Sequence, residues 1–186
     1  RLIFCAASTH YNEELFIGKI HKELKLKYNN LLTILIPRHT NRTGSIINEL
    51  KNINLEITTK SSKKKISKNT DIFILDTYGE TSKFYSLSNI AFVGGSMIPH
   101  GGQNPLEPAR MGNYILHGPN VQNFKEIYII LRRLNISSRI KSINGMKKKI
   151  INKIKHKQAI KVSEKLNSMG NEILKKNLNE IYNYLR

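Results

Sequence analysis

The sequence predicts an α/β fold with a Rossmann-like, mostly parallel sheet. Short apolar runs alternate along the chain with longer segments in which apolar residues recur every three or four positions. This alternation is typical of βαβ units, whose parallel strands are covered by helices. Polar or glycine-rich turns follow five of the apolar runs, and ligands of open α/β sheets bind at such strand ends.

The first part of the chain supplies most of the predicted strands. Strands are expected at 1–8 (RLIFCAAS), 31–37 (LLTILIP), 55–59 (LEITT) and 71–76 (DIFILD). Helices are expected at 44–53 (GSIINELKNI) and at 12–28, where helical spacing relates Leu15, Ile17, Ile20, Leu24 and Leu26. The polar segment 61–70 (SSKKKISKNT) is predicted to be an exposed loop.

The second part continues the alternation and then changes character. Helices are expected at 79–88, 105–112 and 123–135, and strands at 90–95 and 114–118. From residue 144 to residue 186 the pattern is helical and basic, without a further strand. We therefore predict one Rossmann-like domain at 1–143 with a helical C-terminal extension of the same domain at 144–186.

The composition excludes several classes of protein. With 186 residues, of which 39% are hydrophobic, the chain can bury a core and is not a disordered tail. No run approaches the roughly 18 apolar residues of a membrane span, and residues 1–30 lack a signal-peptide pattern, so a soluble, cytoplasmic protein is expected. The single cysteine, Cys5, excludes a disulfide framework and is expected to be buried and reduced.

The formal net charge of +18 has two interpretations. It can attract nucleic acid, an anionic membrane surface or phosphorylated substrates. It can also reflect solvated lysines in a chain that is rich in Lys, Asn and Ile. Residues 141–186 hold twelve Lys or Arg against three Glu, a net +9, which concentrates half of the charge in a quarter of the chain.

The strand-end turns carry the candidate site residues. Ser8 and Thr9 either contribute to a crevice or cap the first helix, and His10 and His39 are either site residues or local hydrogen-bond partners. Arg38 suits a phosphate or a carboxylate, or else a surface salt bridge. In the turn Thr77 to Glu80, Gly79 permits close approach of a ligand, while Glu80 either faces that ligand or caps its own helix.

The most specific stretch is FVGGSMIPHGGQNPLEPARMG, residues 92–112. Gly94 and Gly95 allow unusual φ values at a strand end, and Gly101 and Gly102 bring the main chain close to a ligand. Asn104 is a good N-cap, Pro105 suits the first helical position, and Glu107 can form a capping box or accept hydrogen bonds from a ribose diol. An anionic or polyhydroxyl ligand is expected at this helix N-terminus.

Together the motifs STHYNEE, PRH, DTYGE, FVGGS, GGQNPLEPA and GPNVQNF resemble the C-terminal half of the 3-deoxy-D-manno-octulosonic acid (Kdo) transferases, over about residues 1–135. The resemblance implies the C-terminal, nucleotide-sugar-binding domain of a GT-B glycosyltransferase. The CMP-Kdo contacts that it implies are Pro37, Arg38, Tyr78, Gly79, Glu80, Asn104, Pro105, Leu106 and Glu107. Supporting positions are Ser8, His10, Gly94, Gly95, Ser96, Gln103 and Asn123.

The resemblance further implies an inverting transfer of Kdo from CMP-Kdo to a lipid A precursor, at the cytoplasmic side of the bacterial inner membrane. No catalytic residue, cofactor or metal is assigned to this chain, because the base is expected in an N-terminal acceptor domain that the sequence lacks. The chain alone is therefore expected to be inactive. The expected partners are the CMP-Kdo donor, the lipid A precursor acceptor and the membrane surface. Binding of nucleic acid is not expected.

Two residues depart from the family pattern. Asn12 replaces the glycine of S-T-H-x-G-E-E, and asparagine tolerates left-handed backbone. Gln103 replaces the histidine of G-G-H-N, which keeps a donor and removes a titratable group. Two alternative functions remain: another GT-B-like enzyme that uses a UDP-sugar, and a non-catalytic basic module that binds nucleic acid or membrane.

Overall fold

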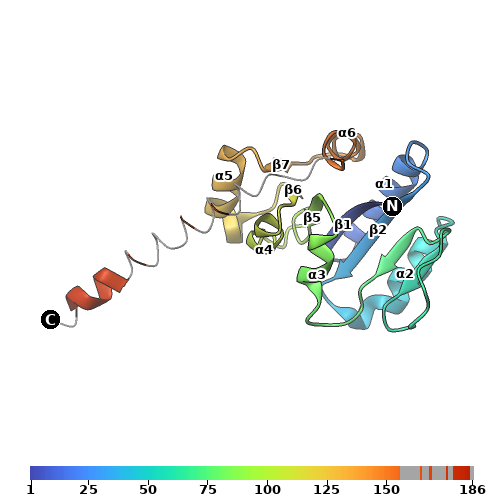
Figure 1. Ribbon diagram of the computed structural model, residues 1–186, viewed down its shortest axis with the longest axis horizontal. Coiled ribbons are helices and arrows are strands. Elements are labelled where there is room, and N and C mark those ends of the chain that lie inside the picture. Colours follow the sequence, from blue (N-terminus) through green and yellow to red (C-terminus); the bar gives the residue numbers. More distant parts are fainter. Residues whose placement is uncertain (156–163, 165–167, 169–174, 176–177, 185–186) are drawn as a thin grey trace.

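The computed structural model describes residues 1–155, 164, 168, 175 and 178–184. Within them, a parallel seven-stranded sheet has the order β3-β4-β2-β1-β5-β6-β7 (Figure 1). The strands are β1 (Leu2–Thr9), β2 (Leu31–Pro37), β3 (Ile57–Thr59), β4 (Ile72–Ile74), β5 (Ile90–Val93), β6 (Tyr114–His117) and β7 (Ser137–Arg139). Every pair of neighbouring strands is parallel, which confirms the predicted fold class.

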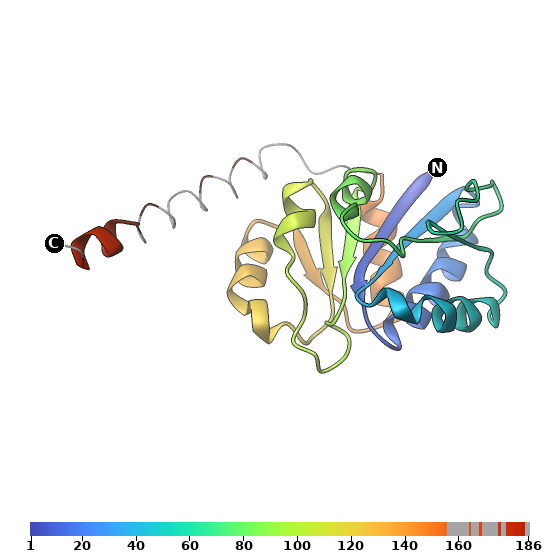
Figure 2. The same cartoon turned by 90° about the horizontal axis from the view of Figure 1, so that it is seen from below.

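Helices cover both faces of the sheet (Figures 1 and 2). The helices α1 (Glu13–Lys25), α2 (Thr43–Lys51) and α6 (Ile143–Lys153) share one apolar cluster with the sheet. The helices α3 (Thr81–Ser86), α4 (Leu106–Arg110) and α5 (Lys125–Arg133) share the other. Two short 3₁₀ turns, η1 (Thr40–Arg42) and η2 (Gln122–Phe124), lead into α2 and α5.

The alternation of side chains along β1 explains why two apolar layers form. Phe4 and Ala6 belong to the layer under α1, whereas Cys5 and Ala7 belong to the opposite layer. Successive side chains of a strand point to opposite faces, so a strand buried on both faces must be continuously apolar. Cys5 is fully buried and free, as predicted, and burial raises the pKa of its thiol.

The strand order contains a topological switch point between β1 and β5. From β1 the chain moves to β2 and on toward β3, and it later returns to the other side of β1 with β5. Ligands of open α/β sheets bind where the carboxyl ends of two such strands diverge. The loops after β1 and β5 are therefore the first place to look for a site.

The predicted helices and strands up to residue 135 are all present, with shifted ends. The strand β7 was not predicted, because Ser137–Arg139 carries no apolar run to mark it. The predicted basic extension begins with α6, whose Met146 and Ile150 pack in the α1 layer. The remainder of that extension lies outside the described residues except at 154–155, 164, 168, 175 and 178–184. Within the described residues, no helix has the combined length and hydropathy that crossing a bilayer needs.

Candidate functional site

A buried carboxylate joins the two loops at the switch point. Glu13, in the first turn of α1, is 1% exposed. Its Oε2 accepts hydrogen bonds from the backbone amides of His10 (3.0 Å) and Gly95 (2.7 Å). Its Oε1 accepts from the amides of Ser96 (3.0 Å) and Met97 (2.9 Å). A buried carboxylate needs several donors, and these four fix the conformation of the loop after β5 against the loop after β1.

The glycines of this loop serve two different purposes. A Cβ on Gly94 would lie 2.3 Å from the carbonyl oxygen of Ser8, so only glycine lets β5 approach β1 so closely. Gly95 has φ +64°, a left-handed conformation. The expectation that Gly94 is needed for an unusual φ is therefore wrong, since close packing of two backbones requires it, whereas the expectation for Gly95 is confirmed.

Farther along the loop, Gly101 (φ +101°) and Gly102 (φ +78°) pack against the segment after β6. A Cβ on Gly101 would lie 2.3 Å from the side chain of Asn123, whose Nδ2 donates to the carbonyl of His100 at 3.4 Å. Asn123 thus holds the shape of the glycine loop. These glycines bring the main chain close to another part of the protein.

Ser96 also has a supporting position. Its side chain is fully buried, and its Oγ donates to the carbonyl of Val93 (2.6 Å) and accepts from the amide of Gly118 (2.8 Å). The hydroxyl therefore ties the end of β5 to the end of β6. Its hydrogen-bonding capacity is used within the protein.

Three histidines gather beside this loop. The His10 ring lies 4.2 Å from that of His100 and 5.9 Å from that of His39, between ring centroids. Burial first, and then the neighbouring histidines, Arg38 and Arg42, lower the pKa of His10 to about 4, so this imidazole is neutral near neutral pH. Nε2 of His10 lies 3.3 Å from the Gln103 amide nitrogen, which only donates, so Nε2 accepts.

Asn12 adopts φ 71° and ψ −22° directly before α1. This left-handed conformation confirms that asparagine can replace the glycine of the family pattern. The interpretation of Ser8 or Thr9 as the cap of this helix is wrong, because Asn12 is the residue that precedes Glu13. Ser8 instead has φ 54° at the irregular end of β1.

The next glutamate, Glu14, forms a two-pronged ion pair with Arg42 from η1. Its oxygens lie 3.0 and 3.3 Å from the two guanidinium nitrogens, and the Glu14 side chain is fully buried. Burial raises the pKa of Glu14, and the hydrogen bonds and charge of Arg42 oppose that rise. Together with the Arg38 amide, which donates to the carbonyl of Thr9 at 2.9 Å, this pair binds the loop after β2 to the start of α1.

The loops after β2 and β4 are also connected. Thr40 Oγ1 donates to the hydroxyl of Tyr78 at 3.1 Å, and Tyr78 is 76% exposed. The Arg38 side chain is exposed and forms no ion pair in the part of the chain that the structure describes, so the salt-bridge alternative is not realised there. Pro37 is buried at the end of β2 and contributes shape rather than a polar group.

Glu80 faces two cations across the loop after β4. Its carboxylate lies 3.6 Å from both Lys60 and Lys83, and it accepts from Thr77 Oγ1 at 3.3 Å. Slight desolvation works to raise the pKa of Glu80, but Lys60 and Lys83 outweigh it and lower that pKa. Glu80 directly precedes α3 without a side-chain cap, and Gly79 has φ +85° with open space around its Cα.

The cap predicted for α4 is off by one residue, because the helix begins at Leu106 and its N-cap residue is Pro105 rather than Asn104. Asn104 Oδ1 accepts from the amide of Leu106 at 3.0 Å, which satisfies one free donor of the helix start. The predicted capping box is wrong, because Glu107 accepts a hydrogen bond from the hydroxyl of Ser82 in α3 at 2.5 Å. Glu107 is exposed and Pro105 is buried, so the glutamate is the more accessible of the two.

The expected contact residues thus lie on neighbouring loops at the carboxyl edge of the sheet, and hydrogen bonds link these loops. Within the described residues, no group of three His, Cys, Asp or Glu side chains is arranged to hold a metal ion. Sequence reasoning missed Glu13 and Glu14, since acidic residues in a first helical turn are usually explained by the helix dipole. The available signal was the pair of consecutive glutamates. One acidic residue is enough to interact with the helix dipole, so the second pointed to a further role.

No known family model matches the chain. The chain is 34% identical over 177 residues to the 3-deoxy-D-manno-octulosonic acid transferase of Haemophilus influenzae, which is 95% of this chain and 41% of that protein. It is 40% identical over 127 residues to the enzyme of the same name from Rickettsia felis, covering 68% of this chain and 27% of that protein. The chain therefore spans less than half the length of these curated relatives.

One solved structure has a similar fold at similar sequence identity. It is the C-terminal CMP-Kdo binding domain of WaaA from Acinetobacter baumannii, with a TM-score of 0.73 and 30% identity. The match covers 77% of this chain and 75% of that chain.

Proposed function

Since the chain belongs to the family of 3-deoxy-D-manno-octulosonic acid (Kdo) transferases and matches the C-terminal domain of one member, we propose that it binds CMP-Kdo as the donor-binding half of such an enzyme. The ligand occupies the carboxyl edge of the sheet, beside the loops after β2, β4 and β5. The expected contacts at Pro37, Arg38, Tyr78–Glu80 and Asn104–Glu107 remain the proposed binding set.

The observation that carries the proposal is that the loops after β2, β4 and β5 form one continuous wall. Thr40 bonds Tyr78, and Ser82 bonds Glu107, so three separate strand ends form one connected surface. A nucleotide sugar has a base, a ribose and a phosphate spaced along its length. A wall that presents a guanidinium, a glycine turn and a carboxylate in succession suits such a ligand.

Each exposed polar group has a proposed role. Arg38 binds the phosphate through its guanidinium, which forms no ion pair among the described residues. Glu107 accepts hydrogen bonds from the ribose diol, and the Ser82 hydroxyl orients it. The amides of the Tyr78–Glu80 turn bind the edge of the cytosine.

The transfer itself follows from the bonds that change. A hydroxyl oxygen of the acceptor forms a bond to the anomeric carbon of Kdo, and the bond from that carbon to the phosphate oxygen breaks with inversion. CMP leaves with the electron pair, and Arg38 stabilises the charge that develops on its phosphate. We assign the base that removes the hydroxyl proton to the part of the longer relatives that this chain does not match.

The acceptor is proposed to be a lipid A precursor at the cytoplasmic surface of the bacterial inner membrane. The chain carries a net charge of +18, and its acceptor would be phosphorylated and held in an anionic leaflet. Each Lys or Arg close to such a surface contributes about 1 kcal/mol of attraction. The basic surface therefore favours the approach of the donor domain to the membrane.

Calorimetric titration of the chain with CMP, CDP, UMP and UDP tests the donor assignment. We expect saturable binding with CMP preferred, weakened about tenfold or more by Arg38→Ala and by Glu107→Ala, because each removes a charge-assisted hydrogen bond. Arg133→Ala and Glu126→Ala are matched controls on α5 that change the same charges elsewhere, and they should leave affinity unchanged.

Other outcomes identify other functions. A preference for UDP would indicate a GT-B-like enzyme with a different donor. Binding only to single-stranded nucleic acid, with a steep dependence on salt and no nucleotide binding, would indicate a basic binding module. Loss of CMP affinity in the α5 controls equal to that in the site variants would reject the proposed contacts.

A further inference from the structure

A separate cavity of about 250 Å³ lies between α5 and the ends of β6 and β7. One face of α5 forms a wall of it, since Lys125, Tyr128, Ile129 and Arg132 have the spacing of one helix face. His117 and Arg139 complete the polar lining from the two strand ends. Three cationic side chains therefore border one cavity, and no carboxylate lines it.

The register of the sheet explains why these groups converge. His117 and Arg139 are partners in the β6–β7 pair, so their side chains point to the same face of the sheet. That face is the one covered by α5, because the His117 ring lies 4.3 Å from the Tyr128 ring, between centroids. Arg139 is thereby directed toward the helix that carries Arg132.

The cations of this cavity have no anionic partner in the part of the chain that the structure describes. None of the ion pairs there includes Lys125, Arg132 or Arg139. The two aromatic side chains of the cavity, His117 and Tyr128, are held by bonds to the main chain. His117 Nδ1 donates to the carbonyl of Gly118 at 2.7 Å, and the Tyr128 hydroxyl donates to the carbonyl of Gln103 at 3.1 Å. The cavity thus combines a rigid base with unneutralised positive charge.

Burial, and next the charges of Arg139 and Arg132, lower the pKa of His117 to about 4, opposed by the hydrogen bond to Gly118. The two guanidinium groups therefore act on the same buried ring from two different elements. A phosphate between them would offset their mutual repulsion as well as pair with each.

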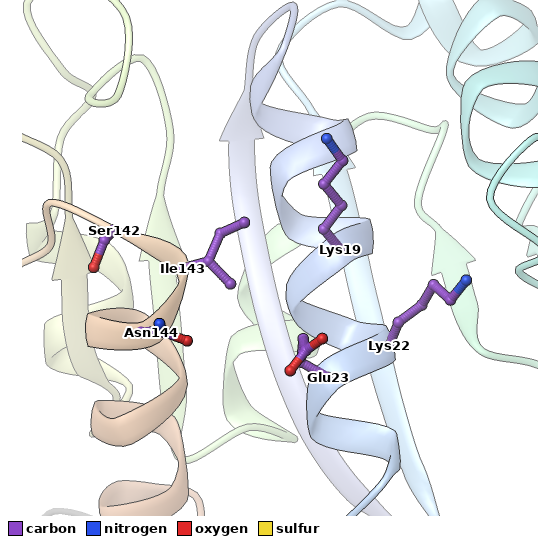
Figure 3. A pocket seen from close by; sticks show the side chains of 6 residues that line it. All are labelled: Lys19, Lys22, Glu23, Ser142, Ile143 and Asn144. Carbon is purple, nitrogen blue, oxygen red and sulfur yellow. The ribbon is translucent and has the colours of Figure 1, made fainter.

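The basic groove between α1 and α6 is a weaker candidate. It is lined by Lys19, Lys22 and Glu23 on one side and residues 142–144 on the other. In Figure 3 the Lys22 ammonium points away from α6, and Glu23 is already paired with Lys147 at 3.0 Å. Its charges do not converge on one point.

We propose that the cavity bordered by Lys125, Arg132 and Arg139 is a binding site for a phosphate monoester group. The planar guanidinium of an arginine can donate two parallel hydrogen bonds to two oxygens of a phosphate, and a third cation adds to the attraction for the dianion. The group can belong to a soluble phosphorylated metabolite or to a lipid headgroup. The site lies beyond β6, on the far side of β5 from the loops after β2 and β4.

Titration with glycerol 3-phosphate at fixed ionic strength tests this site by calorimetry. Because the donor site can also accept a phosphate, the measurement uses the chain with Arg38→Ala. We expect one saturable site that Arg132→Gln or Arg139→Gln weakens about tenfold or more. Arg133→Gln is the matched control, since it removes the same charge from the next residue of α5, and it should change affinity less than about twofold.

Vesicles separate the two sources of the group. Phosphatidic acid presents a phosphate monoester, whereas phosphatidylglycerol presents a diester. Binding to phosphatidic acid vesicles that Arg132→Gln weakens more than Arg133→Gln supports a lipid headgroup, and the same contrast with glycerol 3-phosphate alone supports a soluble ligand. Equal effects of Arg132→Gln and Arg133→Gln with both probes, or no saturable binding to either, would overturn the proposal.

Discussion

The Glu13 carboxylate accepts a hydrogen bond from the backbone amide of Gly95 at 2.7 Å, which joins the first turn of α1 to the loop after β5. The two residues are 82 positions apart, and the bond crosses the switch point of the sheet. Since Glu13 accepts from three further amides, it organises the wall on which the proposed donor site depends.

Replacing Glu13 by Gln should destabilise the protein by about 2–4 kcal/mol, because an amide NH₂ would then face backbone donors in a buried site. Affinity for CMP should fall together with stability, since the loop after β5 loses its anchor. Urea unfolding and calorimetry measure the two effects. Glu23→Gln is the control, because its exposed pair with Lys147 is worth at most about 1 kcal/mol. Equal stability of the two variants would contradict the role given to Glu13.

Two glycine substitutions should have opposite effects on the stability of the protein. Gly94→Ala places a Cβ 2.3 Å from the carbonyl oxygen of Ser8, so two backbones must move apart and we expect a loss of about 3 kcal/mol or more. Gly44→Ala in α2 meets nothing within 4 Å and should stabilise the protein by about 0.4–1 kcal/mol. The midpoints of urea unfolding compare the two variants directly. A Gly94→Ala protein as stable as the original would show that the two strands need not approach so closely.

The periodic elements could be predicted from the sequence, because apolar spacing reports burial locally. The left-handed conformation of Asn12 was expected only because the family pattern has glycine at that position and asparagine tolerates the same backbone. The edge strand β7 could not be predicted, because its residues Ser137–Arg139 are polar and gain their strand conformation from pairing with β6.

The site was predictable as a set of loops but not as a network. Glu13 and its amide donors are far apart in sequence, so no local pattern reports their contact. Glu107 was expected either to form a capping box or to accept hydrogen bonds from a ribose diol, and no local pattern indicated that its carboxylate accepts from the Ser82 hydroxyl of α3. Contacts between side chains of different elements depend on the packing of the layers, which no local sequence pattern reports.

Removing Arg42 should leave Glu14 as an unpaired buried carboxylate. We expect Arg42→Gln to cost about 3–5 kcal/mol near neutral pH, with Arg133→Gln as an exposed control within about 0.5 kcal/mol. The pKa of Glu14 is already raised by burial and should rise further in the variant. A raised carboxyl pKa means that the native state binds a proton more readily than the unfolded state. The difference in free energy of unfolding between Arg42→Gln and the original protein should therefore shrink as the pH falls through that pKa. Urea unfolding at about pH 7 and about pH 5 measures this, and a difference independent of pH would contradict the explanation.

Acid should destabilise the protein through His21. This fully buried ring bonds Thr33 Oγ1 at 2.8 Å through Nδ1, and burial, opposed by Asp71, lowers its pKa from 6.5 to about 4. A lowered histidine pKa means that folding favours the neutral ring, so its contribution is fully present above pH 6.5 and is lost as the pH falls toward 4. The loss is at most about 3 kcal/mol.

The variant His21→Gln isolates this contribution, because glutamine can still bond Thr33 but does not titrate. Its free energy of unfolding should be lower near neutral pH, by about 1–2 kcal/mol, and should then fall less steeply than that of the original protein between about pH 6.5 and about pH 4. Parallel curves for His21→Gln and the original protein would assign the acid sensitivity to other groups, whereas a shallower curve would show that the buried His21 ring, which joins α1 to β2, contributes to it.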